Sequence, residues 1–352
     1  IQNAINSMES GTVYFPAGEY LINNTVNLKP GVALFSYSSS QTKLIAGSDN
    51  MVMIFYVMTG GGGVSGLSMK GFYLSATGKT NVTGIKIHGY ESGSTLGRVE
   101  FVQLTDLYCL DFIMAIDLYL CVGPTLENIL VQRSDTGFQL RNCTDSDIIG
   151  CKANLGSGIG FSLKGDGQAQ GGGGSAYDEG TKMVNCTTNG QGQGIVLDGV
   201  DWGVISNCTF TSDPDGAFKA SSSSNWKISN CHIASNPWPG NGNRSSGVEL
   251  AVDTDRFSFS NCFISLSTFG LVARGSNTIV NGCNFVSNNN VDIYLTGNRN
   301  AITGNVFENS TASIPNSIAE VGGNYSNVTG NILNKGISLV GANSVESNNI
   351  IG

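Results

Sequence analysis

The sequence predicts an all-β protein, a single-stranded parallel β-helix that opens with a short capping helix. Three observations predict this fold: a glycine-rich but apolar composition, an internal repeat marked by cysteines, and a glycine-led strand in each repeat. Glycine accounts for 48 of the 352 residues, and 40% of all residues are hydrophobic. Because disorder requires low hydrophobicity, this composition indicates many short strands separated by turns.

The cysteines mark the repeat. Four segments are copies of one another: "VISNCTF" (204–210), "KISNCHI" (227–233), "SFSNCFI" (258–264) and "TIVNGCNF" (278–285). Cys186 and Cys208 lie 22 residues apart, Cys208 and Cys231 lie 23 apart, and Cys262 and Cys283 lie 21 apart. The interval from Cys231 to Cys262 is 31 residues, so this repeat carries an insertion. A fixed period of this length is the signature of a solenoid.

Each repeat also contains a strand that begins with glycine, as in "GFQL" (137–140), "GIVL" (194–197), "GVEL" (247–250) and "GLVA" (270–273). The residue after the glycine and the residue two further on are mostly apolar, which is the alternation of a strand with one buried face. A unit this short cannot bury its face alone, so stacked units are expected. The asparagine before each cysteine suits a tight bend and a ladder of side chains, and the cysteine is expected to be a small buried residue.

The N-terminal stretch begins with "IQNAINSM" (1–8), a short amphipathic helix that is suited to capping the open end of a solenoid. We expect a single domain over residues 1–352, with the cap and first rungs in 1–50 and regular rungs over 99–352. Loop insertions are expected near 164–180 and 236–247. The chain begins abruptly at Ile1, so it is expected to be a fragment of a longer protein.

The stretch "GTVYFPAGEYLINNTVNL" (11–28) resembles the start of the pectate-lyase-like superfamily of right-handed β-helices, which includes many bacteriophage tailspikes. The resemblance implies the fold, a bacterial polysaccharide as partner and a homotrimeric assembly. It also implies a location on the virion tail or elsewhere outside the cell. Many activities occur on this scaffold, so function depends on the site.

Charge and composition exclude other partners. The net charge of −8 argues against nucleic acid, whose phosphates require basic stripes. Membrane insertion is not expected, because no stretch approaches the roughly 18 apolar residues of a membrane helix. The nine cysteines are odd in number and form no CxxC pair, so no metal site is expected. His232 is interpreted as structural.

The segment "DPDGAFKAS" (213–221) resembles the polygalacturonase family, in which an acidic pair precedes a strand ending in lysine. The resemblance implies that Asp213 and Asp215 face a substrate cleft. On the next rung, Ser245-Ser246-Gly247 replaces the Gly-His-Gly of that family, and its Arg-x-Lys is absent. An ordinary polygalacturonase is therefore not expected.

The neighbouring rungs supply two further carboxylates. In "GVEL", Glu249 should point outward between Val248 and Leu250, and Asp198 lies just past "GIVL". Carboxylates about 5 Å apart suit a retaining glycosidase, and about 7–10 Å suits an inverting one. The candidate catalytic residues are therefore Glu249 and Asp215, assisted by Asp213 and Asp198.

Several residues are candidates for contact with sugar. Trp238 lies between two prolines in the 236–247 insertion, where its ring could stack on a pyranose, and Arg244 is nearby. Tyr177 lies in the 164–180 insertion. The remaining candidates are expected to line the same groove as Glu249: Lys219, Arg274 and Tyr294.

Three functions follow. The first is an endo-acting glycoside hydrolase of the tailspike type, which needs no cofactor and cleaves a bacterial surface polysaccharide. The second is a polysaccharide lyase, in which Asp198, Asp213 and Asp215 hold Ca²⁺ and Lys219, Arg274 or Tyr294 abstracts the proton α to a uronate carboxylate. The third is an adhesin that binds glycan without cleaving it, and an epimerase or another chemistry on this fold is a further alternative.

Overall fold

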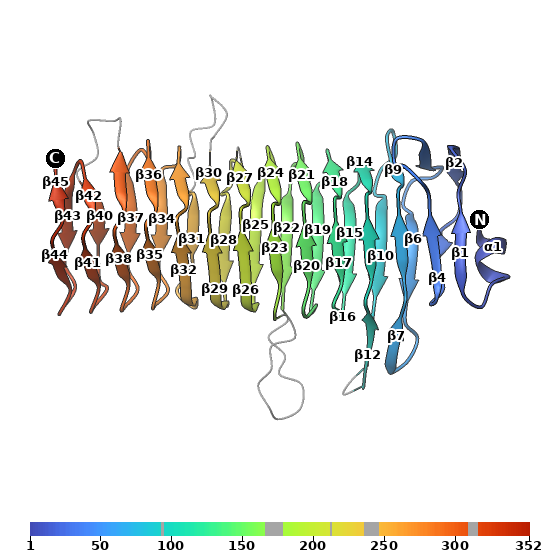
Figure 1. Cartoon of the computed structure of the whole chain (residues 1–352), viewed down its shortest axis with the longest axis horizontal. Helices are drawn as coiled ribbons and strands as arrows, with labels where there is room; N and C mark the ends of the chain where they lie inside the picture. The colour runs from blue at the N-terminus through green and yellow to red at the C-terminus, as the bar shows by residue number, and fades with distance from the viewer. Residues whose placement is uncertain (93–94, 166–178, 212, 236–245, 309–315) are drawn as a thin grey trace. The chain divides into compact units, whose positions relative to one another are not determined.

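The structure is a computed structural model that describes residues 1–92, 95–165, 179–211, 213–235, 246–308 and 316–352. It consists almost entirely of parallel β-strands, and its residues form two compact units, Ile1–Cys186 and Thr187–Gly352. In each unit one rung contributes a strand to each of three sheets, here called A, B and C. Figure 1 shows the strands of successive rungs stacked within each unit. The single-domain organisation stays a prediction.

The described residues of unit 1 contribute seven strands to sheet A and six each to sheets B and C. Sheet A comprises β1 (Gly11–Tyr14), β4 (Val32–Phe35), β8 (Ser68–Lys70), β13 (Gln103–Thr105), β17 (Thr125–Glu127), β20 (Asp147–Ile149) and β23 (Lys182–Val184). Sheet B comprises β2 (Gly18–Ile22), β5 (Thr42–Ala46), β9 (Tyr73–Ser75), β14 (Tyr108–Leu110), β18 (Leu130–Gln132) and β21 (Lys152–Asn154). Sheet C comprises β3 (Val26–Asn27), β6 (Val52–Val57), β10 (Thr83–His88), β15 (Met114–Tyr119), β19 (Thr136–Arg141) and β22 (Ile159–Lys164).

Unit 1 also carries a projecting sheet, which Figure 1 shows extending away from the rungs. Its strands are β7 (Gly62–Ser65), β11 (Tyr90–Ser92), β12 (Thr95–Glu100) and β16 (Cys121–Val122). Strands β11 and β12 pair antiparallel, whereas β12 pairs parallel with β7 and β16. Because β11 follows β10 directly, this hairpin begins at the end of a sheet C strand.

Unit 2 repeats the same order of strands. Sheet A comprises β26 (Asp201–Ser206), β29 (Ser224–Ser229), β32 (Asp255–Ser260), β35 (Ile279–Asn281), β38 (Ala301–Thr303), β41 (Asn327–Thr329) and β44 (Val345–Ser347). Sheet B comprises β24 (Thr187–Asn189), β27 (Thr209–Thr211), β30 (His232–Ala234), β33 (Phe263–Ser265), β36 (Asn284–Val286), β39 (Val306–Glu308), β42 (Ile332–Leu333) and β45 (Ile350–Ile351). Sheet C comprises β25 (Gln193–Asp198), β28 (Phe218–Ser221), β31 (Val248–Leu250), β34 (Phe269–Ala273), β37 (Val291–Leu295), β40 (Asn316–Glu320) and β43 (Gly336–Leu339).

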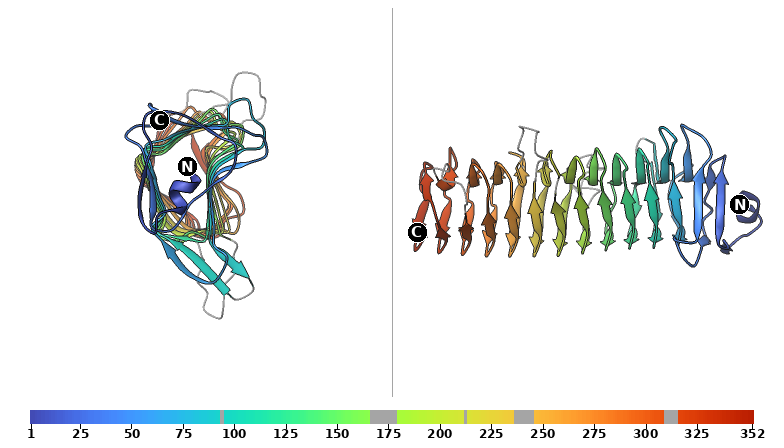
Figure 2. Two further views of the ribbon diagram at one scale, coloured as in Figure 1. Left: turned by 90° about the vertical axis from the view of Figure 1, so that its right-hand side faces the viewer. Right: turned by 90° about the horizontal axis from the view of Figure 1, so that it is seen from above.

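The predicted capping helix is confirmed as α1 (Gln2–Asn6). Figure 2 shows α1 at the N-terminal end of unit 1, within the outline of the rungs in the end-on view. Ile5 is fully buried, and the Gln2 side chain exchanges hydrogen bonds with the backbone of Asn27. The helix therefore covers apolar side chains that the first rung would otherwise expose to water.

The interpretation of the cysteines as structural is confirmed, because all nine are reduced thiols in the interior. Burial raises the pKa of the Cys109 thiol to about 12, so it stays protonated at neutral pH. The residue before each repeat cysteine has positive φ, which is the predicted bend; it is asparagine as at Asn207 and Asn230, but glycine at Gly282 before Cys283. After Cys283 the same position holds Asn305 and then Asn331, both fully buried.

Those two asparagines form a side-chain ladder at the cysteine position, whereas the sequence predicted a ladder of the asparagines that precede the cysteines. Asn305 donates from its backbone N–H and its Nδ2 to Oδ1 of Asn331, each at 3.0 Å. Asn331 in turn donates from the same two groups to Oδ1 of Asn349, at 2.9 and 3.0 Å. The ladder satisfies backbone groups at a turn where the chain leaves one sheet for the next.

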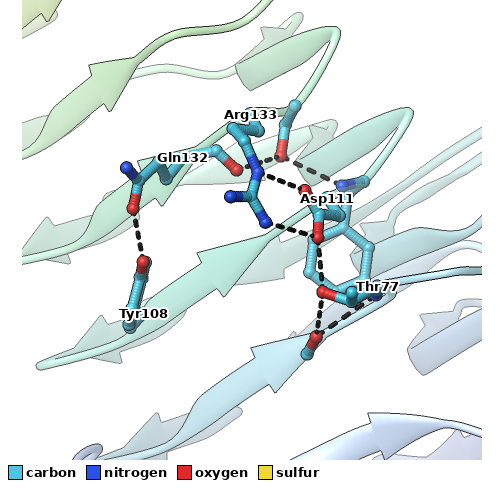
Figure 3. A network of polar contacts seen from close by, with 8 residues as sticks. Thr77, Tyr108, Asp111, Gln132 and Arg133 are labelled. Carbon is cyan, nitrogen blue, oxygen red and sulfur yellow. Dashed lines mark hydrogen bonds and ion pairs between the residues drawn. The ribbon is translucent and has the colours of Figure 1, made fainter.

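A polar network at another bend links three rungs of unit 1 (Figure 3). Arg133 donates two hydrogen bonds to the Asp111 carboxylate, at 2.7 and 2.9 Å, and Thr77 donates a third. These contacts, with the Arg133 hydrogen bond the largest, lower the pKa of Asp111 despite its partial burial. Tyr108 donates to Gln132 on the next rung. The carboxylate is thus saturated by its neighbours, which indicates a structural role.

Candidate functional site

Sheet C of unit 2 carries the predicted groove residues on its outward face. The strand register aligns Lys219, Glu249, Val272 and Tyr294 in one row across four rungs. Val248 and Leu250, on either side of Glu249, are fully buried. The predicted outward position of Glu249 is therefore confirmed.

Glu249 forms an ion pair with Arg274, whose Nη1 donates to Oε1 at 2.5 Å. The structure therefore brings together two residues that the sequence placed in the same groove. In this arrangement Glu249 accepts a hydrogen bond, whereas a general acid would have to donate one to the glycosidic oxygen. Tyr294 lies beyond them, with its ring centroid 5.8 Å from that of Phe269.

The other two surface carboxylates do not lie opposite Glu249. Asp198 aligns with Ser221, which donates a 2.9 Å hydrogen bond to it, and this position is two rungs and two residues from Glu249. At about 4.8 Å per rung and 3.3 Å per residue, the two Cα atoms are roughly 12 Å apart. Asp215 is exposed in the turn before β28. The residue that pairs with Glu249 on the neighbouring strand is Lys219.

Asp213 differs from the expectation that it faces a cleft, because its side chain is completely buried. Thr188 donates to Oδ2 at 2.6 Å, and the backbone N–H of Gln191 donates to Oδ1 at 3.0 Å. The backbone carbonyl of Asp213 also accepts from Ser235 and Gly216. The carboxyl thus ties the turn to the rung before it, and burial raises its pKa to about 7.

Replacing Asp213 by asparagine should flatten the pH dependence of stability. A carboxyl whose pKa is raised on folding from 3.8 to about 7 contributes stability at low pH that is lost as pH rises through about 7. At about 1.36 kcal/mol per pKa unit, the loss is of the order of 4 kcal/mol. Urea unfolding at pH 4 and pH 8 measures the effect. The free energy of unfolding of Asp213→Asn, relative to that of the wild type, should be higher at pH 8 than at pH 4. The exposed Asp215→Asn is the control, and parallel curves for Asp213→Asn and wild type would refute the assignment.

Three predicted sugar contacts, Trp238, Arg244 and Tyr177, lie outside the described residues. Within the described ranges, no group of three His, Cys, Asp or Glu side chains could hold a metal ion. The lyase hypothesis that used Asp198, Asp213 and Asp215 as Ca²⁺ ligands therefore lacks a supporting cluster among these residues.

Sheet C of unit 1 contains a second cluster, which the sequence analysis missed. His88, Asp117 and Arg141 come from three successive strands, β10, β15 and β19. Nε2 of His88 lies 2.8 Å from Oδ2 of Asp117, and Nη2 of Arg141 lies 3.4 Å from Oδ1. The Tyr119 ring packs 5.5 Å from the His88 ring, and the Arg141 guanidinium lies 5.0 Å from the Tyr119 centroid. Four residue types used in acid–base chemistry and anion binding thus meet on one face.

Asp117 points outward in the strand alternation, since Ile116 and Leu118 on either side are fully buried. Even so, only 8% of Asp117 is exposed, because the neighbouring side chains cover it. Burial alone raises the pKa of Asp117, but the hydrogen bond and charge of His88, with the charges of Arg141 and Lys86, outweigh it and lower the pKa. The carboxylate is therefore ionised at neutral pH.

An ionised Asp117 can only accept hydrogen bonds, which determines the protonation of its partner. Nε2 of His88 must carry the proton that it shares with Asp117, so a neutral ring carries its lone pair on Nδ1. Nε of Arg141 is buried and has no hydrogen-bond partner among the described residues. An unsatisfied guanidinium N–H beside a histidine with an available lone pair suits an anionic ligand that also gives up a proton.

The projecting hairpin forms one border of this cluster. Glu91 of β11 accepts a hydrogen bond from the Tyr119 hydroxyl. Lys86 lies beside Asp117 in the register, and Lys164 lies beside Arg141. His88, Lys86 and Arg141 therefore surround the Asp117 carboxylate, in a chain whose net charge is −8, whereas Lys164 lies two rungs and two residues from it.

A sequence signal for this cluster existed. The segments "GIKIH" (84–88), "AIDLY" (115–119), "GFQLR" (137–141) and "GFSLK" (160–164) follow the glycine-led strand pattern, with alanine in place of glycine once. The third and fifth residues of each segment point outward. On three successive strands these positions hold lysine and histidine, then aspartate and tyrosine, and then arginine.

The rungs and their register define the chain as a parallel β-helix protein. The family model described as "Right handed beta helix region" matches residues 172–350. The chain belongs to this family, and the predicted right-handed fold is confirmed.

Solved structures agree on the fold. The A-module of Azotobacter vinelandii mannuronan C-5 epimerase AlgE6 has a TM-score of 0.70 at 17% identity, over 100% of this chain and 93% of that chain. Tailspike protein 3 of bacteriophage CBA120 has a TM-score of 0.62 at 10% identity, over 99% of this chain and 58% of that one. The DFA-IIIase of Arthrobacter chlorophenolicus A6 has a TM-score of 0.57 at 13% identity, over 91% and 83%. No curated protein matches the sequence. None of the helices in the described ranges is long and apolar enough to span a membrane.

Proposed function

We propose that the chain is a polysaccharide-processing enzyme that removes the C5 proton of a uronate unit in an acidic glycan. The observation that carries this proposal is the outward but buried Asp117, held between His88 and Arg141. An ion pair built only for stability would not need the adjoining histidine, tyrosine and unsatisfied Arg141 Nε.

The charges select the substrate class. Arg141, Lys86 and Lys164 can pair with the carboxylate of a uronate, and a guanidinium suits that group through two parallel hydrogen bonds. Neutralising this carboxylate makes the proton on the adjacent C5 more acidic, because negative charge develops on the carboxylate as the proton leaves. A neutral sugar has no carboxylate with which these basic side chains could pair.

The chemistry follows from the orientation of His88. Its Nδ1 accepts the C5 proton, and Asp117 stabilises the imidazolium that forms. In an elimination, the C5–H electron pair forms a C4–C5 double bond, the bond from C4 to the glycosidic oxygen breaks, and Tyr119 gives that oxygen a proton. In an epimerisation, C5 instead regains a proton on its opposite face. Both reactions share the first step, which defines the proposal.

The comparisons agree with an acidic glycan, since two of the similar structures are named as mannuronan C-5 epimerase modules. A tailspike-type hydrolase is the second candidate. It rests on the Glu249–Arg274 pair beside Lys219, with Asp215 in the adjoining turn. The predicted homotrimer and the location on a virion tail or outside the cell belong to the same proposal.

Incubation with polygalacturonate, alginate and a panel of bacterial capsular and O-antigen polysaccharides tests this function. Chain length, ultraviolet absorbance and hydrogen exchange at C5 in deuterated water are followed together, with and without EDTA. Shortening with new absorbance, or C5 exchange without shortening, is expected. Shortening without absorbance or exchange, lost in Glu249→Gln, would replace the proposal by a hydrolase. Binding without any reaction across the panel would indicate an adhesin.

A further inference from the structure

One bend of unit 2 is lined by residues with left-handed backbone. The position just before or early within the sheet A strands has φ between 53° and 61° in seven successive rungs. These residues are Trp202, Asn225, Arg256, Asn277, Arg299, Tyr325 and Asn343. Backbone N–H groups at this bend donate to the carbonyl of the next rung, as from Arg256 to Ser276 at 3.2 Å. The bend is therefore a regular feature, with one residue about every 4.8 Å.

The residue types at this bend divide into two groups. Three rungs use asparagine, which tolerates the left-handed region because its short side chain bonds locally. The other four rungs use tryptophan, arginine or tyrosine, for which this conformation is unfavourable. Stability alone would favour asparagine throughout, so the large side chains at Trp202, Arg256, Arg299 and Tyr325 indicate another role.

These large side chains extend into solvent. Trp202 is 62% exposed and Tyr325 is 61% exposed, unlike Trp226, which is buried in the core. Arg256 is also exposed, and its Nε forms a 3.1 Å ion pair with Asp255 on the same strand. The remaining guanidinium nitrogens of Arg256 can still reach a ligand. The bend thus presents aromatic side chains at Trp202 and Tyr325, with the cations Arg256 and Arg299 between them.

A cavity adjoins the first three rungs of this bend. Its volume is ≈ 320 Å³, and Trp202, Asn225, Lys227, Arg256 and Ser258 are among the residues that line it. This volume lies at the lower end of the roughly 300–1,000 Å³ range of ligand pockets. The lining combines an indole face, an amide, a hydroxyl and two cations from three strands, β26, β29 and β32. Gly203, Val204 and Trp226 complete the lining, and an apolar lining with a few polar groups is typical of a ligand pocket.

We propose that Trp202, Asn225, Arg256 and Lys227 form a binding subsite for a uronate unit of an acidic polysaccharide. The sugar ring packs on the Trp202 indole, its carboxylate pairs with Arg256 and Lys227, and its hydroxyls bond to Asn225. Arg299 and Tyr325 extend the subsite along the bend to further units of the same chain. This inference rests on the proposed function for the acidic nature of the glycan, but it concerns a different sheet in the other unit.

The test uses the full chain and three probes: polygalacturonate and alginate as acidic glycans, and dextran as a neutral one. Binding is measured by titration calorimetry and by the tryptophan emission shift, in an Asp117→Asn background that prevents turnover. Trp202→Asn and Arg256→Asn should each weaken binding of the acidic probes at least tenfold, while Tm stays unchanged or rises because asparagine tolerates the bend. Raising the salt concentration should weaken wild-type binding.

Leu266→Asn is the matched control, since Leu266 is also an exposed residue with φ of 55° in unit 2, but it lies on another bend. It should leave acidic glycan binding unchanged. Unchanged binding in both Trp202→Asn and Arg256→Asn would overturn the subsite, as would equal binding of dextran. A changed oligomeric state with unchanged glycan binding would assign the surface to a second copy of the chain. Binding at Trp202 without turnover in the wild type would refute only the proposed function.

Discussion

Replacing His88 by glutamine is expected to reduce turnover of a uronate polysaccharide by about 10²–10⁴-fold, the usual contribution of a general base. Glutamine can still donate a hydrogen bond to Asp117, so the fold of β10 and β15 should persist. Its amide cannot take up the C5 proton, so C5 exchange and chain shortening should both be lost. The measurement is the initial rate of each on one substrate, with binding of that substrate followed separately.

His232→Gln provides the control, because His232 is the only other histidine in the chain. It lies on sheet B of unit 2, where burial lowers its pKa and Ser265 Oγ lies 3.4 Å from Nε2. Its replacement should leave the rate unchanged. Equal rates for His88→Gln and wild type would remove His88 from the proposed chemistry. Loss of substrate binding together with the rate would instead make it a binding residue, which also contradicts the proposal.

Truncating Asn331 to alanine is expected to lower the free energy of unfolding by about 4 kcal/mol. Its Oδ1 accepts from the Asn305 backbone N–H, and its Nδ2 donates to the Ile302 carbonyl, both at 3.0 Å. Alanine leaves these two buried backbone groups without partners, at about 1–3 kcal/mol each. Urea unfolding of the variant and wild type under one set of conditions measures the difference.

Asn331→Cys is the matched substitution, because cysteine occupies the equivalent position in earlier rungs of unit 2. There the Cys283 sulfur lies 3.4 Å from the Cys262 backbone nitrogen and 3.6 Å from the Asn281 carbonyl. Cysteine at 331 should therefore cost less than half as much as alanine. If both variants unfold within about 1 kcal/mol of the wild type, the ladder contributes little and stacking of the strands alone stabilises this bend.

The sequence by itself determined the fold, because every repeat has to bury the same strand face against its neighbours. Alternation in "GVEL" placed Val248 and Leu250 inside and Glu249 outside, and the structure agrees. The asparagine–cysteine pair likewise marked the bend and the interior stack, as at Asn207 and Cys208. These are local choices of side-chain size and backbone conformation, so they are visible in one repeat.

Only the tertiary structure decided which side chains meet. His88 and Asp117 are 29 residues apart and Asp117 and Arg141 are 24 apart, because insertions of unequal length separate the rungs. Only the pairing of the strands shows that these residues lie on neighbouring strands. The side chain of Asp213 turns inward because Thr188 and Gln191 on the previous rung offer donors there. Composition and period do not record such contacts, since they depend on the register between strands and on the direction of each turn.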